Sequence, residues 1–74
     1  MVENSEKQLL VKIGLNVKRL RLDKKLSQFQ LSTEAEIPKN QIGRIERAEI
    51  NTTILTLNKI ANVLDVDIKE LLSE

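Results

Sequence analysis

The chain has 74 residues and a net charge of only +1, with one aromatic residue and neither Cys nor His. A chain of this length forms one domain and buries only about 60% of the surface that it exposes when unfolded, which suits a small bundle and not a roomy catalytic cleft. Without Cys there is no disulfide framework or zinc finger, and without His the commonest general base and metal ligand are missing, so we expect no enzyme, no metal and no other cofactor.

The N-terminal residues MVENSEKQ are polar, and no apolar run approaches the roughly 20 residues that a membrane-spanning helix needs. The sequence therefore predicts neither a signal peptide nor a membrane segment. We expect the protein in the cytoplasm.

The first helix is expected from about Glu6 to Lys24, after a flexible tail at residues 1–5, so that the single domain covers residues 6–74. Ser5 and Gln8 have the spacing of a capping box at its start. Its apolar residues recur at helical intervals and predict one buried stripe: Leu9, Leu10, Ile13, Val17 and Leu20.

The second helix is expected to begin after Ser27, which forms a capping box with Gln30. Leu31 and Ala35 then face the core. Phe29, the only aromatic residue, has two interpretations: it covers the edge of the core, or it is an exposed contact for a partner.

The third helix is expected from Lys39 to Arg47, with Pro38 pre-setting a helical φ at its start. At about 100° per residue, Ile42 and Ile45 fall on one side. The opposite side and its flanks carry the polar residues and one glycine: Lys39, Asn40, Gln41, Gly43, Arg44 and Arg47. Guanidinium and carboxamide groups suit a polyanion, although a plain solvated helix face has a similar composition.

Two further helices complete an all-α bundle of five. Thr53 is the expected N-cap of the fourth, and Asp67 with Glu70 the capping box of the fifth. The apolar residues at the C-terminus have two interpretations. They close the core, or they form a homodimer interface with apolar residues near the N-terminus; the residues concerned are Ile68, Leu71 and Leu72 with Val2, Leu9 or Leu10.

Charge is unevenly distributed along the chain. Residues 11–25 hold six Lys or Arg and one Asp, whereas residues 48–74 hold two Lys and five acidic residues. A DNA-facing side and an opposite side can therefore coexist in a nearly neutral molecule.

From Ile13 to Leu72 the chain resembles the lambda-repressor and Cro-like, or Xre, family of helix-turn-helix regulators. Four separate motifs carry the resemblance in register: Ile13-Gly14 with Leu20-Arg21; Leu26-Ser27-Gln28 with Leu31; Ile42 with Arg44-Ile45-Glu46; and Thr56-Leu57 with Lys59-Ile60-Ala61 and Val63-Leu64. The resemblance implies a compact five-helix lambda-repressor-like domain whose helix-turn-helix consists of the second and third helices.

The resemblance also implies roles for individual residues. Arg21 and Glu46 would form a semi-buried structural ion pair between the first and third helices. Base edges would be read by Lys39, Asn40 and Arg44, and DNA phosphates would be held by Gln28, Gln41, Arg47, Asn51 and Thr52. Where the family commonly has Gly at helix ends, this chain has Lys25, Glu36, Ala48 and Asp65, so these turns are strained or differ in geometry.

The implied function is sequence-specific binding of double-stranded DNA by a transcriptional regulator of the repressor, antitoxin or controller type. A homodimer would read a pseudo-palindromic operator, and a toxin is a possible second partner. The alternative is a protein-interaction module on the same fold, for which Phe29 and the Leu-rich C-terminus are the support.

Overall fold

The computed structural model describes residues 2–73, with side chains described from Ser5 to Ser73. Within these residues the chain forms α-helices and no strands, which confirms the expected all-α class. The helices are α1 (Val2–Asp23), α2 (Gln28–Ala35), α3 (Gln41–Glu46), α4 (Ile54–Leu64) and α5 (Lys69–Leu72).

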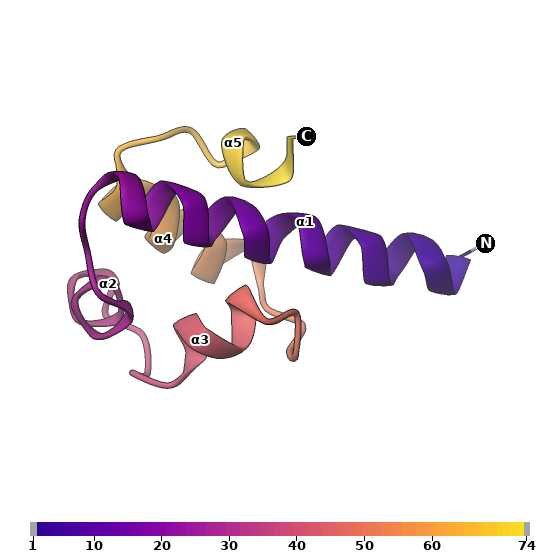
Figure 1. Cartoon of the computed structure of the whole chain (residues 1–74), viewed down its shortest axis with the longest axis horizontal. Coiled ribbons are helices and arrows are strands. Elements are labelled where there is room, and N and C mark those ends of the chain that lie inside the picture. Colours follow the sequence, from indigo (N-terminus) through magenta and orange to yellow (C-terminus); the bar gives the residue numbers. More distant parts are fainter. Residues whose placement is uncertain (1, 74) are drawn as a thin grey trace.

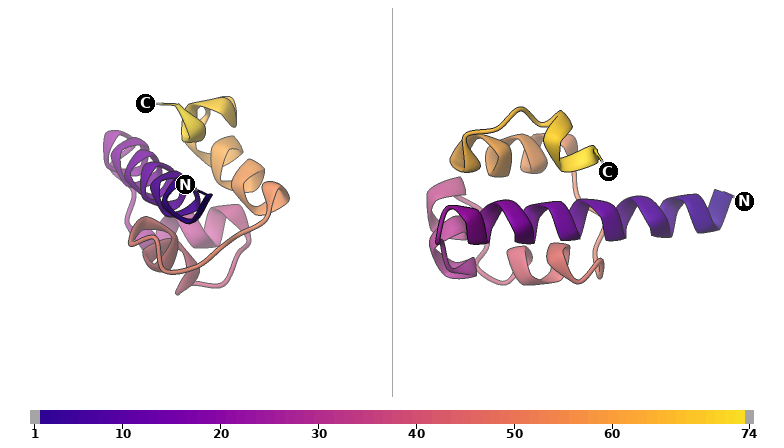
Figure 2. Two further views of the ribbon diagram at one scale, coloured as in Figure 1. Left: turned by 90° about the vertical axis from the view of Figure 1, so that its right-hand side faces the viewer. Right: turned by 45° about the horizontal axis from the view of Figure 1, so that its top comes forward.

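Helix α1 is the axis of the fold (Figure 1). It contacts α3 on one side and α5 on the other, and α2 and α4 complete the bundle around its C-terminal half. Figure 2 shows the same order, with the N-terminal turns of α1 extending beyond the other helices. The 22 residues of α1 largely account for the longest dimension of the molecule, 36 Å, because an α-helix rises about 1.5 Å per residue.

Helix α1 begins at Val2, earlier than the expected start near Glu6. The expected tail at residues 1–5 is therefore helical from residue 2, and Met1 lies outside the described residues. Ser5 is inside the helix, so it cannot act as the predicted N-cap. The physical reason is that residues 2–5 contain neither Gly nor Pro, and Ser in a capping-box spacing does not by itself stop a helix.

Helices α1 to α4 all end in the same way. Each is followed by a residue in the left-handed conformation, at Lys25, Glu36, Ala48 and Asp65, with φ between 59° and 60°. After α3, for example, the Glu49 N–H donates to the Arg44 carbonyl and the Ala48 N–H donates to the Ile45 carbonyl, which is a Schellman motif. The sequence left two alternatives for these turns, backbone strain or a different geometry. The four non-glycine residues adopt the left-handed conformation, so the first alternative is correct.

The predicted caps of α2 and α4 form. The Ser27 hydroxyl accepts from the Gln30 N–H at 2.9 Å, and the Gln30 side chain accepts from the Ser27 N–H at 2.7 Å. Thr53 accepts from the Thr56 N–H at 3.1 Å. At α5 the predicted capping box of Asp67 with Glu70 does not form. Ile68 is the N-cap and makes no side-chain capping hydrogen bond, while Asp67 accepts from the Lys69 N–H at 3.0 Å.

The core lies where the helices meet α1 and α4. Every helix contributes at least one buried apolar side chain, and the largest that are fully buried are Val17, Leu31, Ile42, Ile60, Leu64 and Leu71. None of the described helices is long and apolar enough to cross a membrane.

Gly14 allows α1 to lie directly against α3. A Cβ at this position would be 2.6 Å from the Ile45 carbonyl oxygen and 2.7 Å from that of Glu46. These are backbone atoms, which cannot rotate away. The absence of a side chain at residue 14 therefore sets the distance between the two helices.

Asn16 ties α1 to α5. Its amide nitrogen donates to the carbonyl oxygens of Leu71 at 3.0 Å and Ser73 at 2.7 Å, which lie at the end of α5 where a helix lacks internal partners. Sequence reasoning missed this residue. Its position three residues after Ile13, on the buried side of α1, is the signal that could have found it.

Candidate nucleic-acid interface

Helix α3 is shorter than predicted. It spans Gln41–Glu46, whereas the expected range was 39–47. Lys39 and Asn40 form the turn that leads into it, and the Gln41 N–H donates to the Pro38 carbonyl at 3.0 Å. Pro38 therefore sets the turn before the helix and not its first turn. Asn40 occupies the N-cap position with φ −88° and ψ −4°, and its side chain makes no capping hydrogen bond.

The two faces of α3 separate as the helical periodicity predicts. Ile42 and Ile45 are buried, with 0% and 3% of their surface exposed. Arg44 and Arg47 are exposed over 47% and 57% of their side chains. Lys39 and Asn40 are exposed as well, and Gln41 is half-buried.

Gly43 is the exception on the outer face, because it is buried. A Cβ on Gly43 would lie 2.9 Å from Nη1 of Arg47 and 3.2 Å from Oε1 of Gln28. The side chains of Gln28 and Arg47 thus meet over this glycine, one from α2 and one from the end of α3. These two side chains therefore cover the Gly43 backbone.

Arg21 and Glu46 form the expected ion pair between α1 and α3. Arg21 Nε donates to Glu46 Oε2 at 2.7 Å, and Arg21 Nη2 donates to Oε1 at 3.1 Å. The two side chains are exposed over only 9% and 3% of their surfaces. A third hydrogen bond, from Arg21 Nη1 to the Leu26 carbonyl at 2.8 Å, includes the turn after α1 in the same cluster.

Gln28, the first residue of α2, is held by that cluster. Its Nε2 donates to Glu46 Oε1 at 3.0 Å. Glu46 therefore binds a buried guanidinium and, at the same time, orients an exposed side chain that is expected to contact a phosphate.

An acidic residue that the sequence reasoning did not single out, Glu49, lies close to both Arg44 of α3 and Arg47, which follows the helix. Arg47 Nε donates to Glu49 Oε2 at 2.8 Å, and Arg44 Nε is 4.0 Å from Glu49 Oε1. The hydrogen bond from Arg47 lowers the pKa of the Glu49 carboxyl below its ordinary value and raises the pKa of Arg47. Glu49 is outside the predicted helix, and only the left-handed turn at Ala48 brings it back beside the arginines.

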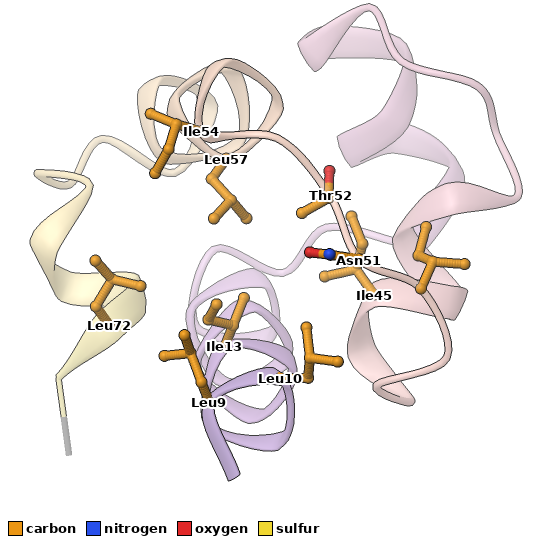
Figure 3. A pocket seen from close by; sticks show the side chains of 10 residues that line it. Leu9, Leu10, Ile13, Ile45, Asn51, Thr52, Ile54, Leu57 and Leu72 are labelled. Atoms are coloured by element: carbon orange, nitrogen blue, oxygen red, sulfur yellow. The ribbon is translucent and has the colours of Figure 1, made fainter. Parts of the chain in front are cut away.

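Asn51 and Thr52 border an apolar groove. The groove has a volume of about 290 Å³, and its walls come from α1, α3, α4 and α5, with Leu9, Ile45, Ile54 and Leu72 among the lining residues (Figure 3). The other predicted DNA contacts do not line this groove.

The structure distinguishes between the two interpretations of Phe29 and of the apolar C-terminal residues. Phe29 is 62% exposed, so the interpretation that it covers the edge of the core is wrong. Leu71 is buried and closes the core, whereas Leu72 is 38% exposed and lines the groove with Leu9. The side chain of Val2, which was named with them, lies outside the described side chains.

Two basic residues of α1 make hydrogen bonds within the protein. Arg21 donates to Glu46, and Nη2 of Arg19 lies 3.4 Å from Oδ1 of Asn16, one turn earlier in the same helix. The expected DNA-facing side formed by residues 11–25 stays a prediction.

The helix-turn-helix family model HTH_3 matches residues 17–71, which is most of the chain. The chain belongs to this helix-turn-helix family. The resemblance inferred from the sequence motifs is thereby confirmed.

Two curated relatives are similar in sequence. The transcriptional regulator SinR of Bacillus subtilis strain 168 is 36% identical over 63 residues, and the immunity repressor of Bacillus phage phi105 is 29% identical over 62 residues. Both alignments cover 84% of this chain, but only 57% of SinR and 43% of the phage repressor. The chain thus spans about half the length of these curated relatives.

Solved structures of the family superpose on most of the chain. The restriction-modification controller protein C.AhdI from Aeromonas hydrophila has a TM-score of 0.81 and 34% identity, over 84% of this chain and 94% of that chain. SinR in complex with DNA has a TM-score of 0.77 and 35% identity, over 82% of this chain and 98% of that chain. These relatives are named as regulators and repressors, in agreement with the expectation that the chain is not an enzyme.

Proposed function

We propose that the chain binds double-stranded DNA sequence-specifically as a transcriptional regulator, with α3 in the major groove. The observation that carries this proposal is the convergence of Gln28 and Arg47 over Gly43, beside the exposed Arg44. The Gln28 side chain from the start of α2 and the Arg47 guanidinium from the end of α3 then lie together, next to the exposed Arg44. This arrangement suits phosphates flanking a groove and base edges inside it.

The proposed contacts fall into two classes. Lys39, Asn40 and Arg44 would reach base edges, with Arg44 bidentate to O6 and N7 of guanine and Asn40 to N6 and N7 of adenine. Phosphates would be bound by Gln28, Gln41 and Arg47, and by Asn51 and Thr52 in the loop before α4. The first class gives sequence preference, and the second gives affinity and salt dependence.

The Arg44→Ala variant is expected to lose base preference at one position of each half-site. A bidentate arginine–guanine contact contributes about 1 to 3 kcal/mol of discrimination, so about 10- to 100-fold of preference should disappear there. Selection from a duplex library with wild type and variant measures this. Lys59→Ala, which removes an exposed charge from α4, is the control, and an unchanged base preference in Arg44→Ala would contradict the assignment.

The Gln28→Ala variant should weaken binding to all duplexes by a similar factor, because a phosphate contact carries no sequence information. The affinities for the selected site and for a scrambled duplex, measured by fluorescence anisotropy, test this. The melting temperature of the free variant should change little, since Glu46 keeps its two hydrogen bonds to Arg21. A loss confined to one sequence would instead indicate that Gln28 reads a base.

A homodimer and a pseudo-palindromic operator are part of the proposal. Leu9 of α1 and Leu72 of α5, which were named from the sequence for a dimer interface, both line the groove in Figure 3, and Ile54, 64% exposed, extends its apolar surface. Two copies related by a two-fold axis would read half-sites about 34 Å apart, one turn of DNA.

Selection of binding sites from a random duplex library at moderate salt tests the proposed function directly. An enriched inverted repeat would support sequence-specific binding by a dimer. An enriched single half-site would support DNA binding and contradict the dimer. Retention that depends only on salt, with no enriched sequence, would contradict the function.

The alternative function is a protein-interaction module on the same fold, and the exposed Phe29 favours it. In that case Phe29→Ala should abolish the biological activity while Arg44→Ala leaves it intact. Roles as an antitoxin with a cognate toxin, or as a controller, are finer forms of the first proposal. A cytoplasmic location, with nucleoid association when bound, belongs to it as well.

A further inference from the structure

Glu49 binds the guanidinium of Arg47, one of the residues proposed to hold a DNA phosphate. Its carboxylate is bound by both donor sides of the Arg47 guanidinium, Nε at 2.8 Å and Nη2 at 3.3 Å. Arg44 approaches the same carboxylate to 4.0 Å. A carboxylate that accepts two hydrogen bonds from one guanidinium binds it as a pair of phosphate oxygens would.

The backbone fixes this position. The Glu49 N–H donates to the Arg44 carbonyl at 2.8 Å, and the left-handed Ala48 reverses the chain at the end of α3. Glu49 is thus brought back alongside the last turn of the helix. The carboxylate is placed by the same motif that ends α3 and does not depend on a flexible loop.

The ion pair between Arg47 and Glu49 is exposed enough to be replaced by a contact between Arg47 and a phosphate. Arg44, Arg47 and Glu49 expose 47%, 57% and 48% of their side chains, so water reaches all three. Exposed ion pairs of this kind contribute little to stability and are screened by salt. The hydrogen bond from Arg47 lowers the pKa of the Glu49 carboxyl below its ordinary value, so the contact favours the charged form. A phosphate can therefore replace the carboxylate at Arg47, and the displaced carboxylate then lies near a polyanion.

We propose that Glu49 is an internal competitor for DNA phosphate, which holds Arg47 in the unbound protein and lowers affinity for all duplexes alike. The proposal rests on the proposed function and adds a residue that limits the affinity for DNA. Its consequence is weaker binding to DNA of any sequence, while the ratio of operator affinity to non-specific affinity, which base contacts such as those of Arg44 set, stays unchanged.

The test is the Glu49→Gln variant, which keeps the shape of the side chain and removes its charge. Affinity for the selected operator and for a scrambled duplex should rise about three- to tenfold, and the slope of log K against log salt should steepen by up to about 0.9, because a displaced carboxylate beside the DNA no longer offsets the charge of Arg47. In an Arg47→Gln background the same substitution should have a much smaller effect, which a purely structural role would not explain.

The matched control is Glu70→Gln. It makes the same change in net charge on α5, which lies across α1 from α3 (Figure 1), and should leave affinity and salt slope nearly unchanged. If Glu70→Gln raises affinity as much as Glu49→Gln, net charge and not competition is responsible, and the proposal is overturned.

The remaining outcomes separate this inference from the proposed function. If wild type binds DNA and Glu49→Gln binds equally or more weakly, only the inference fails. If Glu49→Gln loses affinity for one sequence alone, Glu49 reads a base, and the inference also fails. If neither wild type nor Glu49→Gln binds any duplex at low salt, the proposed function fails, and the inference with it.

Discussion

Gly14→Ala is expected to destabilise the domain by about 1 to 3 kcal/mol, although alanine is the better helix former by about 1 kcal/mol. The added Cβ would lie 2.6 Å from the Ile45 carbonyl oxygen and 2.7 Å from that of Glu46. This clash is relieved only if α1 and α3 move apart. Such a movement loosens both the packing of Ile45 and the Arg21–Glu46 ion pair. Denaturant unfolding followed by circular dichroism measures the change in the free energy of unfolding.

Gly43→Ala is the matched control, since Gly43 also lies in a helix. Its Cβ would meet the ends of two flexible side chains, Arg47 at 2.9 Å and Gln28 at 3.2 Å, and these can move. The variant should be neutral or more stable by up to about 1 kcal/mol. If Gly14→Ala gave the same stabilisation, the close approach of α1 and α3 would be incorrect.

Glu46→Ala should cost about 3 to 5 kcal/mol and lower the melting temperature by roughly 15 °C or more, because it leaves a buried guanidinium with one partner, the Leu26 carbonyl. Such a loss is a large part of the stability of a domain of this size. Thermal unfolding at low protein concentration measures it. Arg21→Met with Glu46→Leu, which removes both charges, should be less destabilised than Glu46→Ala alone.

Glu49→Ala serves as the comparison for that variant. It also removes a glutamate bound to an arginine, but this pair is exposed, so the melting temperature should change little. Equal effects of Glu46→Ala and Glu49→Ala would contradict the distinction between a structural and a surface pair.

Local chemistry made much of the fold predictable. Ser27 with Gln30 and Thr53 mark helix starts through side-chain groups that satisfy free N–H groups, and these caps form. The apolar spacing of Ile42 and Ile45 predicted which side of α3 is buried. The start of α1 was not predictable in this way, because nothing at residues 2–5 breaks a helix and the apparent cap at Ser5 does not end one.

The site was less predictable, because its arrangement depends on contacts between distant segments. The pairing of Arg21 with Glu46 came from the family resemblance together with helical geometry. The covering of Gly43 by Gln28 joins residues from two helices, and the return of Glu49 to Arg47 requires a left-handed residue at a position without glycine. Neither feature has a periodic signal along the chain.

The hydrogen bond between Gln28 and Glu46 bears on the entropy of DNA binding. A glutamine that becomes ordered only in a complex loses rotamer freedom equivalent to as much as about 1.5 to 2 kcal/mol. In this domain Gln28 is already tethered at 3.0 Å to a carboxylate that Arg21 immobilises, so part of that entropy is lost during folding and not on association. The ordered core thus makes the surface more rigid before any ligand arrives, and a variant that loosens the core pair should bind with a larger entropic penalty.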